Sequence, residues 1–318
     1  MDSNNIDYMN IEYPYQNMDM KFNIKKILKK VRKFKPIIVR RLPEGVNNTD
    51  ILKFENEYFF ICENYLRNLH INSITDFFTE DQRVICAIKN NQSPIEMWKQ
   101  NRKKIIKKCK SRYKKVTPLN LRETIYSMTK SCNNFRITVI LAVLSYFKPK
   151  SWLDISAGWG DRLLGALLSN VQYYESADPN LNLRSGYKKI IKAFTNDKTK
   201  NNYIVHNTCF LKADLGDRMF DFVFSSPPFF DLEVYSQCEN DSLVQNRTNE
   251  LWMNNFLLPA IDKCHNHLLP GGIFILYIHS EQYLHMALEL LNGITEYLGA
   301  IYFYDKIPRK MHVWKKNV

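Results

Sequence analysis

Residues 224–230, Phe-Ser-Ser-Pro-Pro-Phe-Phe, combine residue types that could bind a planar amino group. They follow Asp221-Phe222-Val223, a short apolar run that predicts a buried strand. Two consecutive prolines fix the backbone and remove two N–H donors, so this turn accepts hydrogen bonds without donating them. Carbonyls and the Ser226 hydroxyl could hold the two N–H bonds of an NH2 group, while an aromatic ring stacks on its plane. The alternative interpretation is a proline turn that ends a strand, followed by a phenylalanine of the core.

A second stretch, Leu-Asp-Ile-Ser-Ala-Gly-Trp-Gly-Asp-Arg at 153–162, is typical of a strand, a glycine turn and a helix start. Doubly wound sheets bind ligands at such a turn, at the carboxyl end of the first strand. Gly158 and Gly160 would let a ligand approach the backbone closely. The spacing differs from G-x-G-x-x-G, so a pyrophosphate is not the obvious ligand.

The next two expected strands also end in polar residues. The second ends at Asp178, in the position where a ribose diol is usually held. The third ends at Thr208 and Cys209, where an adenine could lie. Because the carboxyl ends of parallel strands share one edge of a sheet, these residues should face the glycine turn.

Strands and helices alternate after Ser151, which predicts a parallel sheet with helices on both faces. The expected strands are Trp152–Ile155, Tyr173–Ala177, Tyr203–His206, Phe220–Ser225, Gly272–His279, Ala300–Asp305 and Met311–Lys315. The expected helices between them are Arg162–Ser169, Leu183–Phe194, Leu251–Leu268 and Glu281–Leu291. Only residues 306–310 join the last two strands, which permits a hairpin and excludes a helical crossover.

This layout resembles the class I S-adenosylmethionine-dependent methyltransferases, over about residues 133–318. More narrowly, it is similar to the enzymes that methylate N6 of adenine or N4 of cytosine, and to phage and large-virus methyltransferases. The resemblance implies a Rossmann-like, seven-stranded doubly wound α/β sheet with an antiparallel C-terminal hairpin. It also implies S-adenosylmethionine as the cofactor.

The resemblance assigns roles to residues of both turns. In this family a D-x-x-x-G-x-G turn contacts the methionine part of the cofactor, and it is matched here by Asp154, Ala157, Gly158 and Gly160. The rest of the cofactor would be held by Asp178, Thr208 and Cys209. Phe135 and Arg136 match a segment that touches the cofactor's carboxylate, although the usual following proline is missing. The catalytic motif (D/N/S)-P-P-(Y/F/W) is matched by Ser226, Pro227, Pro228 and Phe229.

Serine in the first position of that motif leaves the target base open. Aspartate is frequent there among adenine enzymes, and serine is common among cytosine-N4 enzymes. The polar segment 230–247 is expected to form a loop over the site that helps to select the substrate.

The 318 residues carry a net charge of +13, concentrated in two stretches. Residues 21–41 and 99–115 hold ten Lys or Arg each and no acid, which leaves 25 basic against 32 acidic residues elsewhere. Such clustering favours a polyanionic partner, and we expect these stretches to bind nucleic acid. The family resemblance favours DNA, with RNA possible. We therefore expect a flexible lead over 1–20, a basic and mostly helical substrate-binding region over 21–132, and the methyltransferase domain over 133–318.

Helix signals mark several elements of the N-terminal region. Residues 21–35 predict a basic amphipathic helix that Pro36 ends, and Ser93-Pro94-Ile95-Glu96 begins a helix that continues to about residue 112. Further helices are expected from Thr117 to about Lys130 and over Phe135–Phe147. Residues 37–92 match no small fold.

The seven cysteines are odd in number and none has C-x-x-C spacing, so we expect free thiols, without a metal site or a disulfide framework. No apolar run reaches membrane-spanning length and no signal peptide is evident, so a cytoplasmic protein is expected.

Three other functions fit parts of the pattern. A methyltransferase acting on a protein glutamine also uses a Pro-Pro-aromatic turn, although it normally has Asn before the prolines. An RNA methyltransferase acting on a base of tRNA, rRNA or mRNA would suit the basic N-terminal region equally well. A catalytically inactive, nucleic-acid-binding methyltransferase would usually have lost one of the two turns, and both are intact here.

Overall fold

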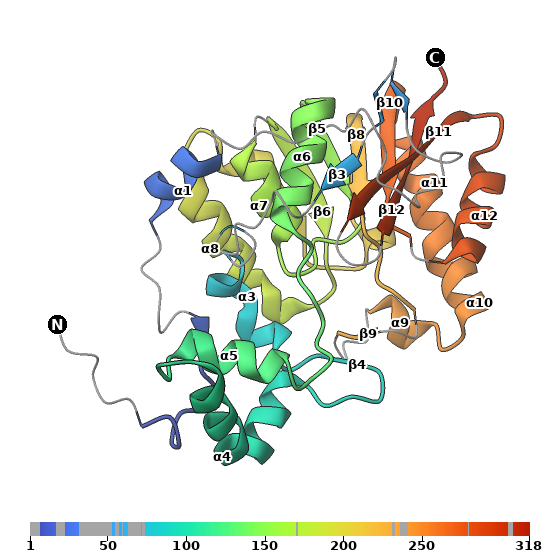
Figure 1. Ribbon diagram of the computed structural model, residues 1–318. Coiled ribbons are helices and arrows are strands. Elements are labelled where there is room, and N and C mark those ends of the chain that lie inside the picture. Colours follow the sequence, from blue (N-terminus) through green and yellow to red (C-terminus); the bar gives the residue numbers. More distant parts are fainter. Residues whose placement is uncertain are drawn as a thin grey trace.

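The computed structural model describes residues 7–16, 23–31, 53–54, 57–58, 60–62, 71, 74–169, 171–230, 233–235, 241–278, 280–304 and 308–318. A central sheet carries helices on both faces, and a smaller group of helices lies at one end of it (Figure 1). The parts of the first basic stretch outside 23–31, and most of the unassigned segment 37–92 before residue 71, fall outside the described residues.

Eight strands form the central sheet, in the order β3-β11-β12-β10-β8-β5-β6-β7. Their bounds are Phe60–Cys62 (β3), Ser151–Asp154 (β5), Tyr173–Ala177 (β6), Tyr203–His206 (β7), Phe220–Ser225 (β8), Leu268–Leu276 (β10), Thr295–Tyr304 (β11) and Pro308–Lys316 (β12). Strands β7, β6, β5, β8 and β10 run parallel, whereas β12 is antiparallel to both β10 and β11. This order confirms the predicted Rossmann-like doubly wound sheet with an antiparallel C-terminal hairpin.

The sheet has one strand more than predicted, because β3 pairs in parallel with β11. Residues 60–62 belong to the segment that matched no small fold. A three-residue strand has no periodicity of its own to identify it, and its partner lies at the other end of the chain. The outer edge of β11 presents unpaired backbone groups, and β3 satisfies part of that edge.

Two short antiparallel ladders lie outside the sheet. Strand β1 (Lys53–Phe54) pairs with β2 (Glu57–Tyr58). Strand β4 (Ala87–Ile88) pairs with β9 (Glu233–Val234), which joins the N-terminal region to the segment that follows the proline turn.

The helices of the sheet domain form two layers, as Figure 1 shows. One layer consists of α6 (Ile137–Phe147), α7 (Asp161–Leu168) and α8 (Arg184–Phe194), and the other of α10 (Asn249–Trp252), α11 (Leu258–Asn266) and α12 (Glu281–Leu291). A π-helical turn, Met253–Leu257, joins α10 to α11, and α9 (Ser242–Gln245) precedes them. The helices expected over 162–169, 183–194, 251–268 and 281–291 are confirmed within two residues at each end.

Alternating residues of the strands point into two separate cores, as the pleat of a strand requires. Trp152 and Phe222 are buried in the core with α6 and α7, whereas Leu153 and Val223 are buried in the core with α11 and α12. This alternation explains why the strand sequences are apolar throughout.

Helix α1 (Ile24–Val31) belongs to the first of these layers. Its Ile27, Leu28 and Val31 side chains pack on the core shared with α6 and α7, and Lys25, Lys26 and Lys29 are exposed. It is shorter at its start than the helix expected over 21–35, and the residues after Val31 lie outside the described part.

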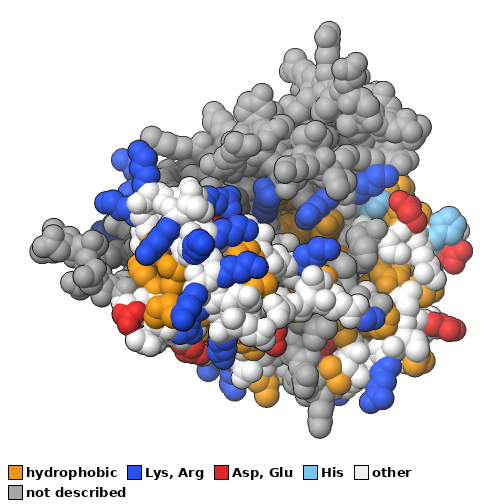
Figure 2. Space-filling view, turned by 60° about the horizontal axis from the view of Figure 1, so that its bottom comes forward, with side chains coloured by type: hydrophobic (Ala, Val, Ile, Leu, Met, Phe, Trp, Pro, Cys, Tyr) orange, Lys and Arg blue, Asp and Glu red, His pale blue; other side chains and the backbone are white. Residues whose placement is uncertain are grey.

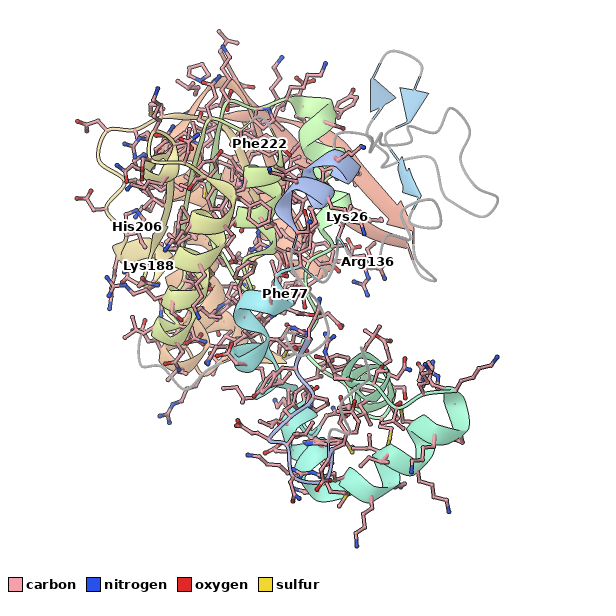
Figure 3. All side chains as sticks on the ribbon, turned by 90° about the vertical axis from the view of Figure 1, so that its left-hand side faces the viewer. Lys26, Phe77, Arg136, Lys188, His206 and Phe222 are labelled. Carbon is pink, nitrogen blue, oxygen red and sulfur yellow. The ribbon has the colours of Figure 1, made fainter. Side chains whose placement is uncertain are left out.

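The remaining helices are α3 (Asp76–Arg83), α4 (Pro94–Arg112) and α5 (Pro118–Tyr126). Helix α4 has the predicted start: the Ser93 hydroxyl accepts from the Glu96 N–H, and the Glu96 carboxylate accepts from the Ser93 N–H at 2.9 Å. Helix α5 ends four residues before the expected Lys130. We call α4 and α5 together, residues 94–126, the α4–α5 pair; it lies at the end of the molecule opposite α1 (Figures 1 and 3).

A third, smaller core holds the α4–α5 pair together around Trp98, Ile105 and Leu121. Tyr13, from the segment expected to be a flexible lead, is 1% exposed and belongs to this core. The Trp98 indole donates to the Ile11 carbonyl at 3.4 Å. Part of the expected lead is therefore packed, because its aromatic residues cover the apolar faces of α4 and α5.

A buried ionic cluster joins α3 to α5. Arg122 donates from Nε to Glu80 Oε1 at 2.5 Å and from Nη2 to Asp76 Oδ2 at 2.9 Å. Arg83 donates to Asp76 Oδ1 at 2.8 Å and to the Tyr126 hydroxyl at 2.9 Å. All four charged side chains are nearly excluded from solvent, so each charge depends on its partners.

We expect Arg122→Ala to lower the free energy of unfolding by about 3–5 kcal/mol, because it leaves buried carboxylates without a counter-charge. Urea unfolding followed by circular dichroism measures this change. Arg184→Ala, at an exposed position of α8, is the matched control and should change stability by less than about 0.5 kcal/mol. Equal effects of the two substitutions would show that the cluster contributes nothing to stability.

Candidate active site

A cavity of about 820 Å³ opens at the carboxyl ends of β5, β6 and β8. The chain passes from β5 to β6 on one side and later returns to β8 on the other, so the cavity lies at a topological switch point of the sheet. Ligands of open α/β sheets bind at such points. Its volume is that of a site for a small molecule or a cofactor.

The structure brings most of the predicted site residues to this one cavity. Those that line it are Phe135, Arg136, Ala157, Gly158, Asp178, Cys209, Ser226, Pro228 and Phe229. Asp154, Gly160, Thr208 and Pro227 do not line it.

Asp154 lies below the cavity and is fully buried. Its Oδ1 accepts from the Ser225 hydroxyl at 2.7 Å and from the Ser156 N–H at 3.2 Å. Its Oδ2 accepts from Arg162 Nε and from the Tyr174 hydroxyl, both at 2.8 Å. With all these donors supplied by the protein, Asp154 fixes the turn and does not face a ligand.

The two glycines of the turn have different surroundings. Both have positive φ, +55° at Gly158 and +91° at Gly160, which other residues rarely adopt. A Cβ at Gly160 would lie 2.8 Å from the Ile190 side chain, so this glycine is needed for packing against α8. A Cβ at Gly158 would meet nothing closer than Arg162 Nη2 at 4.0 Å and would project into the cavity. Gly158 is therefore the glycine that leaves room for a ligand.

Asp178 follows β6 and is 7% exposed. Its Oδ2 accepts from the Gly158 N–H at 3.0 Å, and its Oδ1 accepts from the Asn180 N–H at 2.9 Å. Burial raises the pKa of Asp178 to about 7, although these two N–H groups oppose the rise. Each carboxyl oxygen keeps a lone pair for a ligand.

The proline turn sits directly beside the glycine turn, since β8 and β5 are neighbours. The Ser156 hydroxyl donates to the Ser226 carbonyl at 2.8 Å and ties the two turns together. Within the described residues, the Ser226 hydroxyl has no hydrogen-bond partner. Phe229 is half-buried and meets the Tyr277 ring edge to face, with centroids 5.6 Å apart.

Helix α3 supports the cavity from the side of the N-terminal region. The Thr79 hydroxyl donates to the Trp159 carbonyl at 2.9 Å, and the Thr75 hydroxyl donates to Asp161 Oδ1 at 2.5 Å. Asp161 Oδ2 accepts from the Phe135 N–H at 3.2 Å. Burial raises the pKa of Asp161 to about 6.

The segment after the proline turn also lines the cavity, through Glu233, Tyr235, Asp241 and Ser242. The β4–β9 ladder pairs Ile88 with Glu233, and the Cys86 thiol donates to the Tyr235 carbonyl at 2.8 Å. The loop expected over the site is thus held by the N-terminal region.

Sequence reasoning missed Asp161, Arg162 and Tyr277, which all line the cavity. Glu233 also lines it and belongs to the segment 230–247 that was expected to lie over the site. One signal was available for Arg162, because a cation in the first turn of a helix opposes the helix dipole and requires a specific partner. Tyr277 follows β10, the strand beside β8, but its place depends on strand order, which the sequence does not show directly.

No family model matches the sequence, and no curated protein matches it. Solved structures similar to it include a methyltransferase from Pyrococcus furiosus, with 16% identity over 58% of this chain and 84% of that one and a TM-score of 0.41. TrmN from Thermus thermophilus has 15% identity over 57% of this chain and 49% of its own, also with a TM-score of 0.41. N-methyltransferase NodS from Bradyrhizobium japonicum, in complex with S-adenosylhomocysteine, has 13% identity over 57% of this chain and 85% of its own, with a TM-score of 0.40.

The strand order of this chain itself defines the doubly wound fold. Among the described residues, no group of three or more His, Cys, Asp or Glu could hold a metal ion. In the same part of the chain, no helix has the length and apolar character needed to cross a membrane.

The raised pKa of Asp178 makes stability depend on pH. A carboxyl group with a raised pKa binds its proton more tightly in the folded state, so its contribution to stability is largest below the unfolded pKa of 3.8 and is lost as pH rises to about 7. Between pH 5 and 8, the unfolding free energy of the ligand-free wild type should fall by about 2–3 kcal/mol more than that of Asp178→Asn.

Urea unfolding at several pH values between 5 and 8 measures this difference. Asp262→Asn, an exposed acid on α11, is the control and should leave the pH profile unchanged. If the unfolding free energies of wild type and Asp178→Asn change in parallel with pH, the pKa of Asp178 is not raised.

Proposed function

We propose that this chain is an S-adenosylmethionine-dependent methyltransferase that methylates an exocyclic amino group of a nucleic-acid base. One observation carries the proposal: the Ser226–Phe229 turn and Gly158 border a single cavity at the switch point of a doubly wound sheet, together with Asp178. The cavity therefore combines acceptors for an amino group with a place for a nucleoside-bearing cofactor.

The residues at the glycine turn fit S-adenosylmethionine. The open space beside Gly158 admits a ligand close to the backbone, and the remaining lone pairs of Asp178 suit a ribose diol. Cys209 and Phe210 line the cavity where an adenine would lie. When bound, this cofactor supplies a methyl group that is already activated by its sulfonium charge.

The proline turn would hold the amino group that receives the methyl. The lone pair of such a nitrogen is delocalised into the base, which makes it a poor nucleophile. The Ser226 hydroxyl would accept one of its two N–H bonds and draw the nitrogen towards a tetrahedral form. The Pro227 carbonyl, which the family resemblance implies as the second acceptor, belongs to a residue that does not line the cavity. No strong base is needed, because the nitrogen loses its proton readily once it is cationic.

Phe229 would stack on the target base, with its ring fixed by its edge-to-face contact with Tyr277. Because the amino group of a stacked base cannot reach the floor of this cavity, the target nucleotide must be extruded or unpaired. Adenine N6 and cytosine N4 are the expected acceptors, with DNA favoured; an RNA base or a protein glutamine amide is the alternative.

The exposed charges of helix α4 favour a nucleic acid as the substrate. Its exposed basic residues are Lys99, Lys103, Lys104, Lys107, Lys108, Lys110 and Arg112. Lysines four positions apart repel each other by about 0.2–0.5 kcal/mol per pair, and no described acid forms a salt bridge with them. Figure 2 shows Lys and Arg side chains gathered on the left of the face where α4 and α5 lie.

The α4–α5 pair also borders the cavity, because Glu123 of α5 is one of its lining residues. A nucleic-acid strand bound along α4 would therefore lie beside the proposed site of methyl transfer. The lysines of α1 are at the other end of the molecule, so the described lysines that we assign to the substrate are those of α4 (Figure 3).

The test of this function uses S-adenosylmethionine carrying a labelled methyl group. Duplex DNA, single-stranded DNA, total RNA and a protein extract are offered separately, and the products are digested for mass spectrometry. We expect label in N6-methyladenine or N4-methylcytosine, and loss of at least about 100-fold in turnover for Phe229→Ala with cofactor affinity unchanged. Label in protein alone, or cofactor binding without label in any polymer, would overturn the proposal.

A second experiment tests the role of α4. Replacing Lys99, Lys103, Lys107 and Lys110 by Gln should raise KM for a long polynucleotide. The slope of log K against log salt concentration should become shallower by about 3, because each lost phosphate contact contributes about 0.7–0.9. Turnover at saturation and cofactor affinity should not change. The matched control replaces Lys188, Lys189, Lys192 and Lys198, exposed lysines on or just after α8, which lies on another side of the molecule (Figure 3). Equal effects of both sets would leave α4 without a specific role.

A further inference from the structure

Arg162 is a buried cation at the edge of the cavity that the proposed chemistry does not use. It is the second residue of α7, lines the cavity and is 5% exposed. Its guanidinium carbon lies 5.6 Å from the centre of the Phe135 ring, so the aromatic ring covers one of its faces. A positive charge in this position is costly, because it is excluded from water and opposes the dipole of its own helix.

The described hydrogen-bond partners of Arg162 use only some of the N–H donors of its guanidinium. Nε donates to Asp154 Oδ2 at 2.8 Å, and Nη2 donates to the carbonyl and to the hydroxyl of Ser156. An arginine carries five N–H donors, two of them on Nη1. No described residue accepts a hydrogen bond from Nη1. Its two N–H donors are therefore held in place at the edge of the cavity without a described acceptor.

We propose that Nη1 of Arg162 binds the carboxylate of the methionine part of S-adenosylmethionine. This inference rests on the proposed function. The guanidinium lies beside Gly158, whose missing side chain leaves the ligand its space. A planar guanidinium matches a carboxylate better than any other side chain, and Asp154 and Ser156 hold it in one orientation before the ligand arrives.

The neighbouring residue completes the recognition of an amino-acid group. Asp161 precedes Arg162 and lines the same cavity, so an acid and a base stand next to each other there. A zwitterion carrying a carboxylate and an ammonium group needs this combination of charges. Arg136, the basic residue that the family resemblance indicates, is exposed at the start of α6 and is less suited to a desolvated carboxylate.

The experiment compares S-adenosylmethionine with its decarboxylated form, which lacks only the carboxylate. Isothermal titration calorimetry gives the affinity of wild type, Arg162→Lys and Arg162→Gln for both ligands. Wild type should bind the decarboxylated ligand about 10- to 100-fold more weakly. Arg162→Gln should lose affinity for the complete ligand by that factor and show no preference between the two, whereas Arg162→Lys should fall between.

The possible outcomes separate this inference from the proposed function. If wild type binds both ligands equally well, or if Arg136→Gln rather than Arg162→Gln removes the preference, the role of Arg162 is overturned while the methyltransferase assignment stands. If wild type binds neither ligand, the proposed function itself fails. The comparison in wild type needs no substitution, so it decides the matter even if a variant at this buried position does not fold.

Discussion

The buried carboxylate of Asp154 is the interaction on which the rest of the site depends. It receives donors from four different places: the glycine turn, α7, β6 and the end of β8. A charge in the interior is tolerated only when it is paired and fully hydrogen-bonded, so none of these partners can move without a large cost. The relative position of the glycine turn and the proline turn follows from this one residue. The proposed transfer of a methyl group to a nitrogen would gain from such fixed geometry.

The N-terminal region is part of the site and does more than carry charge. Thr79 of α3 holds Trp159 in the glycine turn, and Thr75, at the start of α3, holds Asp161 just after that turn. The ionic cluster of Asp76 and Arg122 links α3 to α5. The basic helix α4 packs on α5 through the apolar core around Trp98 and Leu121, and α5 is connected to α3 beside the cavity through these buried polar contacts. Each of these contacts needs both partners in place, since a half-satisfied buried network is unfavourable.

The fold and much of the site could be predicted from the sequence because their signals are local. Alternating apolar runs and helices define the doubly wound sheet, and Gly158 and Ser226–Phe229 are recognisable within a few residues. Asp154 was predicted to contact the cofactor and instead lies beneath the cavity, since a motif shows that an acid is present but not which way it faces. Tyr277 and strand β3 depend on contacts between distant segments, and no local pattern encodes such contacts. Arg162 carried a local signal, its position in the first turn of α7, but this signal does not show that the side chain borders the cavity.

The β4–β9 ladder has a consequence for how the protein acquires its activity. The Cys86 thiol and the Tyr235 carbonyl that it contacts are 149 positions apart in the chain. Contacts of such long sequence separation form slowly, because the entropy of closing the loop is lost before the contact contributes anything in return. A ribosome will have made the glycine turn and its strands well before residue 235 emerges, yet the wall of the cavity can close only afterwards. Newly synthesised molecules should therefore pass through a stage in which β5, β6 and the glycine turn have been made while the site is still open and β10, β11 and β12, which follow residue 235, are still missing. Completion of the site is thus a property of the whole chain.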